Sequence, residues 1–153
     1  MINLEIDPEF LSSVESNLIE GAAQATLLHQ SILINASLTI VITGDQQIRE
    51  LNQQYRDVDA PTDVLSFPTD FIDPENQAHY LGDVIISYPR AAEQAQKGGH
   101  PVQGELQLLV VHGVLHLLGH DHAQPGEKAR MWKAQDEILS QLGVEDIHLK
   151  DDE

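Results

Sequence analysis

Residues 105–117 are apolar along nearly their whole length, and this segment constrains the fold of the chain more than any other. We predict a helix here that ends at Gly119, because glycine adopts a positive φ without steric penalty and so leads the chain out of a helix. The stretch falls short of membrane-spanning length and contains His112 and His116. It therefore predicts an apolar helix of a soluble domain that carries two histidines.

Four strands and four further helices are expected around this helix. Strands are predicted where apolar residues alternate with polar ones or where β-branched residues gather, at residues 2–6, 38–43, 64–67 and 81–87. Helices are predicted where apolar residues recur at helical spacing between start and stop signals, at residues 8–28, 45–55, 89–97 and 126–142. Residues 71–79 contain proline, asparagine and acidic residues, so we expect a loop there.

The order of these elements mixes segregated and alternating strands and helices, which indicates the α+β class. The length of 153 residues fits one domain, so we expect a single domain over residues 1–153. In this domain a small mixed four-stranded sheet packs against about five helices.

The composition excludes several kinds of chemistry. The chain has no cysteine, which rules out disulfides, thiolate catalysis and cysteine-ligated zinc or iron–sulfur sites. Its 25 acidic residues against 8 basic ones give a net charge of −17, which argues against a broad electrostatic nucleic-acid surface but leaves room for a local basic cleft. The first ten residues lack a basic start and an apolar core, so no secretory signal is expected. We expect a cytoplasmic protein without membrane association.

A cluster of histidines carries the chemistry. His112 and His116 are four residues apart and point to the same side of the predicted helix. The turn at Gly119 can bring His122 back toward them, and three neutral imidazoles with an open fourth position make a catalytic zinc site. We therefore predict one Zn²⁺, or another divalent transition metal, held by His112, His116 and His122. His120 is the alternative third ligand, and the spacing favours His122 over it.

The same spacing occurs in zinc proteases of the pattern H-E-x-x-H-x-x-G-x-x-H. Gly113 occupies the position of their glutamate, which is the general base of peptide hydrolysis, so the protease interpretation is disfavoured. A coincidence of histidines is also disfavoured, because buried unpaired imidazoles cost free energy. A structural zinc would need a fourth protein ligand, for which His120, Asp121 or a distant acid could serve.

The roles of three acidic residues stay open. Asp121 could accept a hydrogen bond from an imidazole or cap the turn. Glu105 lies two helical turns before His112 and could point at the site, although a solvated first-turn acid is the preferred interpretation. Asp83 could line the cleft or be an acid at the start of a strand.

Three motifs resemble those of the YbeY family of bacterial endoribonucleases, also called rRNA maturation factors. Residues 112–122 (HGVLHLLGHDH) match the family signature throughout. Residues 52–56 (NQQYR) and 62–68 (TDVLSFP) match a second signature, and residues 82–87 (GDVIIS) match a third. Together the matches span residues 52–122 and are highly specific.

The resemblance implies a zinc-dependent endoribonuclease that prefers single-stranded RNA and acts in ribosomal RNA maturation and ribosome quality control. It implies an α+β fold with a metal cleft at one end of the sheet. The family's ligands carry over onto His112, His116 and His122, and its functional arginine onto Arg56. The expected partners are precursor ribosomal RNA and the small ribosomal subunit or its associated proteins, with no DNA.

The expected mechanism uses metal hydroxide as the nucleophile, because no protein general base adjoins the ligands. His116 and Arg56 are the expected catalytic residues, since a guanidinium can hold a phosphate bidentately. The alternative for Arg56 is a surface ion pair with Asp57 or Asp59. Three polar residues of the second motif are expected to border the cleft: Thr62, Asp63 and Ser66. RNA binding to so acidic a chain would need a positive strip, for which the candidates are Arg49, Arg56, Arg90 and Lys97.

Two other functions remain open. The chain could be a non-catalytic ribosome assembly factor with a structural metal, whose acidic surface suits basic ribosomal proteins. It could also be a metzincin-like hydrolase of a peptide or small molecule. An open coordination position would favour an enzyme, and a closed four-ligand site would favour the assembly factor.

Overall fold

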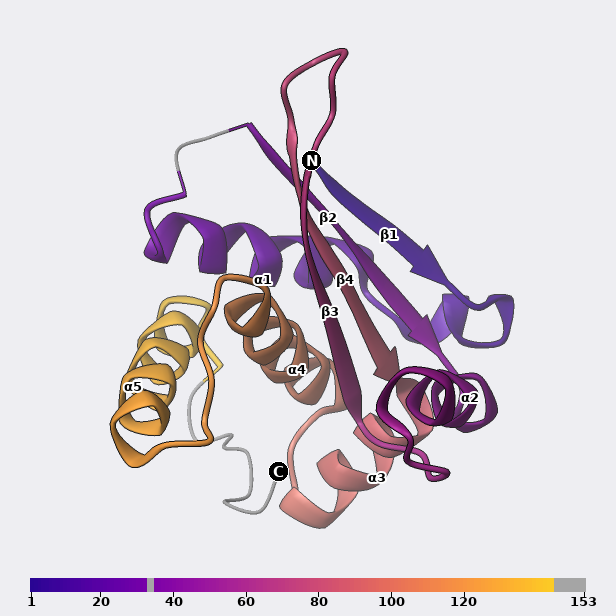
Figure 1. Cartoon of the computed structure of the whole chain (residues 1–153). Coiled ribbons are helices and arrows are strands. Elements are labelled where there is room, and N and C mark those ends of the chain that lie inside the picture. Colours follow the sequence, from indigo (N-terminus) through magenta and orange to yellow (C-terminus); the bar gives the residue numbers. More distant parts are fainter. Residues whose placement is uncertain (33–34, 145–153) are drawn as a thin grey trace.

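A four-stranded mixed sheet in the order β1-β2-β4-β3 runs through the middle of the computed structural model, which describes residues 1–32 and 35–144 (Figure 1). The strands are β1 (Ile2–Ile6), β2 (Ala36–Thr43), β3 (Val64–Ile72) and β4 (His79–Ser87). The first two pairs, β1 with β2 and β2 with β4, are parallel, whereas β3 lies antiparallel to β4 at an edge. The predicted α+β class and mixed four-stranded sheet are confirmed.

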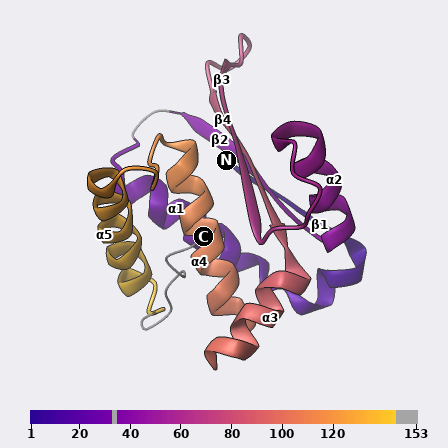
Figure 2. The same cartoon turned by 60° about the horizontal axis from the view of Figure 1, so that its bottom comes forward.

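Helices cover both faces of this sheet. They are the 3-10 helix η1 (Pro8–Ser13) and the α-helices α1 (Ser16–His29), α2 (Asp45–Arg56), α3 (Tyr88–Gly98), α4 (Val102–Leu117) and α5 (Pro125–Gln141). Figures 1 and 2 show α1, α4 and α5 on one side of the sheet and α2 on the other. None of the helices within the described residues is both long and apolar enough to cross a membrane.

The alternation of side chains along the central strands divides the core between the two faces. Val84 and Ile86 of β4 pack into the large cluster with α1, α4 and α5, whereas Ile85 packs with Ile48 of α2 and Leu65 of β3. Thirteen of the sixteen residues of α4 are buried, so the apolar segment predicted as a helix is the central helix of the large cluster.

Gly113 lets α4 lie directly against the sheet. A Cβ atom at this position would meet Val84 Cγ1 at 2.5 Å and Ser66 Oγ at 3.3 Å. The Ser66 hydroxyl donates a hydrogen bond to the Gly113 carbonyl at 3.1 Å, which joins the helix to β3. A glutamate here would collide with the sheet, so the position that supplies the base in zinc proteases serves helix packing in this chain.

The single helix predicted over residues 8–28 is wrong, because it is two helices, η1 and α1, separated at Val14. Val14 is extended (φ −118°, ψ 128°) and buried. The Gln103 side chain of α4 donates to the Ser13 carbonyl at 2.8 Å and accepts from the Glu15 amide at 3.1 Å. A side chain distant in sequence thus satisfies the backbone groups at the break, which local apolar spacing does not reveal.

The loop predicted over residues 71–79 is also wrong in its extent. Phe71 pairs with Tyr80, and the strands continue until a tight turn in which the Asp73 amide donates to the Ala78 carbonyl at 2.8 Å. Strand pairing here uses backbone groups, so the polar composition of the segment does not prevent it. The result is a long β3–β4 hairpin that projects from the sheet (Figure 1).

Candidate metal centre and its cleft

Three imidazoles converge where α4 ends. Ring nitrogens of His112, His116 and His122 all lie within 4.8 Å of one another. His112 and His116 come from consecutive turns of α4, and their Nε2 atoms are 3.1 Å apart. Gly119 then takes a positive φ of 97°, and the following turn returns His122 to ring-centroid distances of 5.1 Å from His116 and 5.6 Å from His112.

Carbonyl oxygens on the far side of two rings determine which nitrogens carry protons. His112 Nδ1 lies 3.1 Å from Gln135 Oε1 on α5, and His116 Nδ1 lies 2.8 Å from the His120 carbonyl oxygen. Each Nδ1 must donate to its oxygen, which leaves both Nε2 atoms with a lone pair in the neutral ring. Two lone pairs facing each other at 3.1 Å repel unless a cation lies between them, so this donor set fits a metal ion.

Burial favours the neutral form of two of the imidazoles, His112 and His116. His112 is 4% exposed, and desolvation lowers its pKa to about 3, with a smaller contribution from neighbouring His116. Desolvation also lowers the pKa of His116, and the nearby charges of His122 and Arg56 act in the same direction. A neutral imidazole is the form that binds a metal, so both rings are ready as ligands at neutral pH.

The group has three members in the part of the chain that the structure describes, and the nearby candidates for a fourth protein ligand, His120 and Asp121, have other hydrogen-bond partners. The His120 ring lies 2.7 Å from Gln30 Oε1, while its backbone carbonyl oxygen lies 2.8 Å from His116 Nδ1. The Asp121 carboxylate accepts from the His122 amide at 2.7 Å, so it caps the turn. This arrangement favours an open coordination position over a closed structural site.

Two other acids lie away from the metal ligands. The expectation that Glu105 is solvated is wrong, because it is 3% exposed and its carboxylate lies 2.7 Å from His100 Nε2. His100, which precedes α4, thus packs against Glu105 in the first turn of the helix. Asp83 lies within β4, where it accepts a hydrogen bond from the Tyr80 hydroxyl, and it is not among the residues that line the cleft.

Contacts from α5 complete the site, and sequence analysis missed them. Gln135 is 1% exposed and orients His112, as described above. Trp132 packs edge-on against the rings of His122 at 5.5 Å and His112 at 6.0 Å. The one available signal was a glutamine beside the apolar inner stripe of α5, where an unpartnered polar group would be costly.

A cleft of about 920 Å³ extends from the imidazoles along the sheet toward α2 and α3. Thr62, Asp63 and Ser66 line it, as does Arg56. The Arg56 guanidinium donates from Nη2 to the Ser66 carbonyl at 2.7 Å and lies 5.5 Å from the centre of the Phe67 ring. The structure thus anchors Arg56 to β3 and not to the acids that follow it in sequence.

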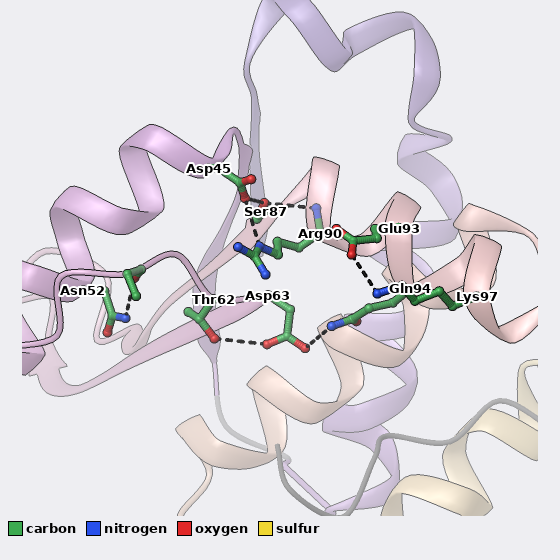
Figure 3. A network of polar contacts seen from close by, with 10 residues as sticks. Asp45, Asn52, Thr62, Asp63, Ser87, Arg90, Glu93, Gln94 and Lys97 are labelled. Carbon is green, nitrogen blue, oxygen red and sulfur yellow. Dashed lines mark hydrogen bonds and ion pairs between the residues drawn. The ribbon is translucent and has the colours of Figure 1, made fainter.

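The proposed strip of four cations does not form. Arg56 and Arg90 line the cleft, whereas Arg49 pairs with Asp59 at 2.7 Å. Lys97 pairs with Glu93 on the exposed side of α3 at 2.8 Å. Figure 3 shows the polar contacts at the α3 end of the cleft, where Asp63 accepts from Thr62 and Gln94.

Comparison with known proteins gives a consistent picture. The family model described as "Endoribonuclease YbeY" matches residues 3–143. A protein named endoribonuclease YbeY from Chloroflexus aurantiacus is 46% identical over 138 residues, which cover 86% of this chain and 90% of that protein. Proteins of the same name from Dehalococcoides mccartyi (44% identical, covering 92% of each chain) and Roseiflexus castenholzii (42%, covering 94% of each) are also similar.

The fold has a counterpart among solved structures. The solution structure of TM1509 from Thermotoga maritima matches with a TM-score of 0.60 and 24% identity, over 99% of this chain and 97% of that one. At this level of identity the likeness concerns the fold alone.

Proposed function

This chain belongs to the YbeY family of endoribonucleases, and from that premise we propose that it is a metal-dependent hydrolase of single-stranded RNA. Its metal would be one Zn²⁺ or another divalent transition ion, held by His112, His116 and His122. The observation that carries the proposal is the convergence of three imidazoles, with the Nε2 atoms of His112 and His116 3.1 Å apart, beside an open cleft.

The residues of the cleft have distinct tasks in this proposal. Gln135 and the His120 carbonyl orient two of the ligands, His112 and His116, before a metal binds. When bound, the metal supplies an acidified water and polarises a phosphoryl oxygen, chemistry that needs no glutamate at position 113. Arg56 would hold the scissile phosphate through the guanidinium donors that the Ser66 carbonyl leaves free.

We place the activity in ribosomal RNA maturation and ribosome quality control in the cytoplasm, with the small subunit or its associated proteins as partners. The family membership supports this role. The net charge of −17 supports contacts with basic ribosomal proteins outside the cleft, because opposite charges steer such encounters. Domain 1–153 would act as a single catalytic unit.

The test combines metal analysis with RNA cleavage. We expect about one metal per purified chain and cleavage of labelled single-stranded RNA in preference to duplex RNA. EDTA or His116→Ala should lower kcat/KM at least about a thousandfold, because both remove the metal chemistry. Arg56→Ala should lower it about a hundredfold, because one electrostatic contact to the transition state is lost.

His79→Ala is the matched control, since His79 lies at the start of β4 and is not among the residues that line the cleft. It should cleave RNA like the unaltered chain, and circular dichroism should show the same fold for all variants. Full cleavage by His116→Ala or by the chelated protein would refute the proposal. Tight metal binding without any cleavage of RNA would favour an assembly factor instead.

A further inference from the structure

Arg90 is the second cationic side chain that lines the cleft, and the proposed function gives it no task. It projects from the first turn of α3, while Arg56 lies beside β3 next to the metal ligands. We infer that Arg90 binds a second phosphodiester of the single-stranded RNA, away from the phosphate held at Arg56 and the imidazoles. This inference rests on the proposed function and adds a subsite to it.

A local network holds Arg90 in place between α2 and α3 (Figure 3). The Ser87 hydroxyl accepts from the Arg90 amide at 3.3 Å, which caps α3, and it donates to Asp45 Oδ1 at 2.7 Å. Asp45 Oδ1 in turn lies 3.5 Å from Arg90 Nε. The buried serine thus couples the first turns of both helices, and the arginine stem is oriented by contacts with its own helix and with α2.

The terminal nitrogens of Arg90 are the part of the side chain available to a ligand. Its Nε is sealed from solvent and faces Asp45, yet the side chain as a whole is 40% exposed. The contacts that hold Arg90 use its backbone amide and its Nε, not its terminal nitrogens. The two Nη groups of a guanidinium can donate parallel hydrogen bonds to two oxygens of one phosphodiester, and the contacts at Nε keep the Arg90 side chain oriented for this.

The ion pair with Asp45 does not account for Arg90 by itself. Both side chains are more than a third exposed, the separation is 3.5 Å, and such surface pairs stabilise a fold little. Acids outnumber basic residues threefold in this chain, so the protein as a whole repels a polyanion. A cation in the cleft offsets this repulsion locally, and its effect on RNA binding should therefore exceed its effect on folding. The Asp63 carboxylate on the adjoining wall would repel a phosphate, which places the phosphate on the Arg90 side of the cleft.

The experiment compares Arg90→Gln with Arg49→Gln, a matched arginine on α2 that pairs with Asp59 outside the cleft. Binding of fluorescein-labelled single-stranded RNA is followed by anisotropy in EDTA over a series of salt concentrations, and cleavage kinetics are measured with metal. Arg90→Gln should weaken binding about tenfold and reduce the slope of log affinity against log salt by about 0.7, the contribution of one phosphate contact. In cleavage its effect should fall on KM more than on kcat, and should shrink as the RNA is shortened.

The control and a conservative variant separate a binding role from a structural one. Arg49→Gln should change affinity by less than about twofold, because its surface pair lies outside the cleft. Arg90→Lys should retain the salt dependence of RNA binding and lose part of the affinity, because lysine keeps the positive charge but lacks the bidentate donors of a guanidinium. If the unaltered chain binds RNA and Arg90→Gln behaves like Arg49→Gln, the Arg90 subsite is overturned while the proposed function stands. If the unaltered chain neither binds nor cleaves RNA, the proposed function fails first.

Discussion

The imidazole wall of the cleft, formed by the three histidines of the candidate metal centre and Gln135, differs in kind from the arginine wall, formed by Arg56 and Arg90. His112 and Gln135 are 4% and 1% exposed and hold each other by a hydrogen bond. Arg56 is exposed and is held by the Ser66 carbonyl and the Phe67 ring, and the Arg90 side chain is 40% exposed. The first wall is buried behind its ligands at His112 and Gln135, whereas the arginine side chains of the second wall are exposed to solvent.

This difference follows from what each wall would bind. A metal ion requires neutral ligands at one set of positions, and burial provides both neutrality and rigidity. A flexible single strand requires charge that stays hydrated until the substrate arrives, because burying an unpaired guanidinium is costly. The imidazole wall should therefore be sensitive to packing and to small changes behind the ligands, whereas changes in the arginine wall should alter substrate binding and leave stability nearly unchanged.

Gly113→Ala tests the packing behind the imidazole wall and should have the largest effect on stability. The new Cβ would lie 2.5 Å from Val84 Cγ1, and a β-branched side chain on a central strand has little room to move. We expect the free energy of unfolding to fall by about 3 kcal/mol in urea titrations. Gly21→Ala on α1 is the control, since a Cβ there meets nothing within 4 Å, and it should raise stability by about 0.5 kcal/mol. Equal effects of the two substitutions would contradict the close approach of α4 to the sheet.

Gln135→Leu tests the hydrogen bond behind His112 at nearly constant side-chain volume. Without the Oε1 acceptor the His112 ring is free to change tautomer, so metal affinity should fall about thirtyfold, equivalent to about 2 kcal/mol. Competition with a chelator of known affinity measures this directly. Gln46→Leu, on the exposed surface of α2, should leave the affinity unchanged. A metal affinity unaffected by Gln135→Leu would show that the α4 backbone alone orients the ligand.

The contrast between the walls also explains how much of the site could be predicted. The spacing of three histidines around Gly119 predicted their convergence, because helix geometry and one turn suffice to bring them together. Gly113 was seen as a departure from the protease pattern, and its packing role became clear only from the distance to Val84. The family motif correctly predicted that Arg56 lines the cleft. It did not predict that the Ser66 carbonyl accepts a hydrogen bond from Arg56.

Errors in the sequence predictions come from polar contacts that apolar spacing does not encode, whether with distant groups, with backbone atoms or between nearby side chains. The contact from Gln135 spans 23 residues, and the partner of His116 is a backbone carbonyl that carries no residue identity. Glu105 looked solvated in the first turn of a helix until His100 was found to cover it. Helical spacing in residues 8–28 continues through a break that Gln103 makes stable. Local periodicity contains none of this information.

The pH dependence of the metal-free chain tests the burial of His112 and should be the smallest of these effects. His112 has a folded pKa of about 3, below the unfolded value of about 6.5, so the unfolded state binds more protons at any pH between the two. Its contribution to stability is therefore complete above about pH 6.5 and is lost as the pH falls toward 3. Between pH 6.5 and 5.5 the loss should be about 1 kcal/mol, measured by urea unfolding in EDTA.

His112→Gln removes this contribution while the effects of the other charges persist in both proteins, so the difference between the two curves isolates His112. Parallel curves would mean that water reaches the His112 ring in the metal-free chain, so that the fold alone does not bury this ligand.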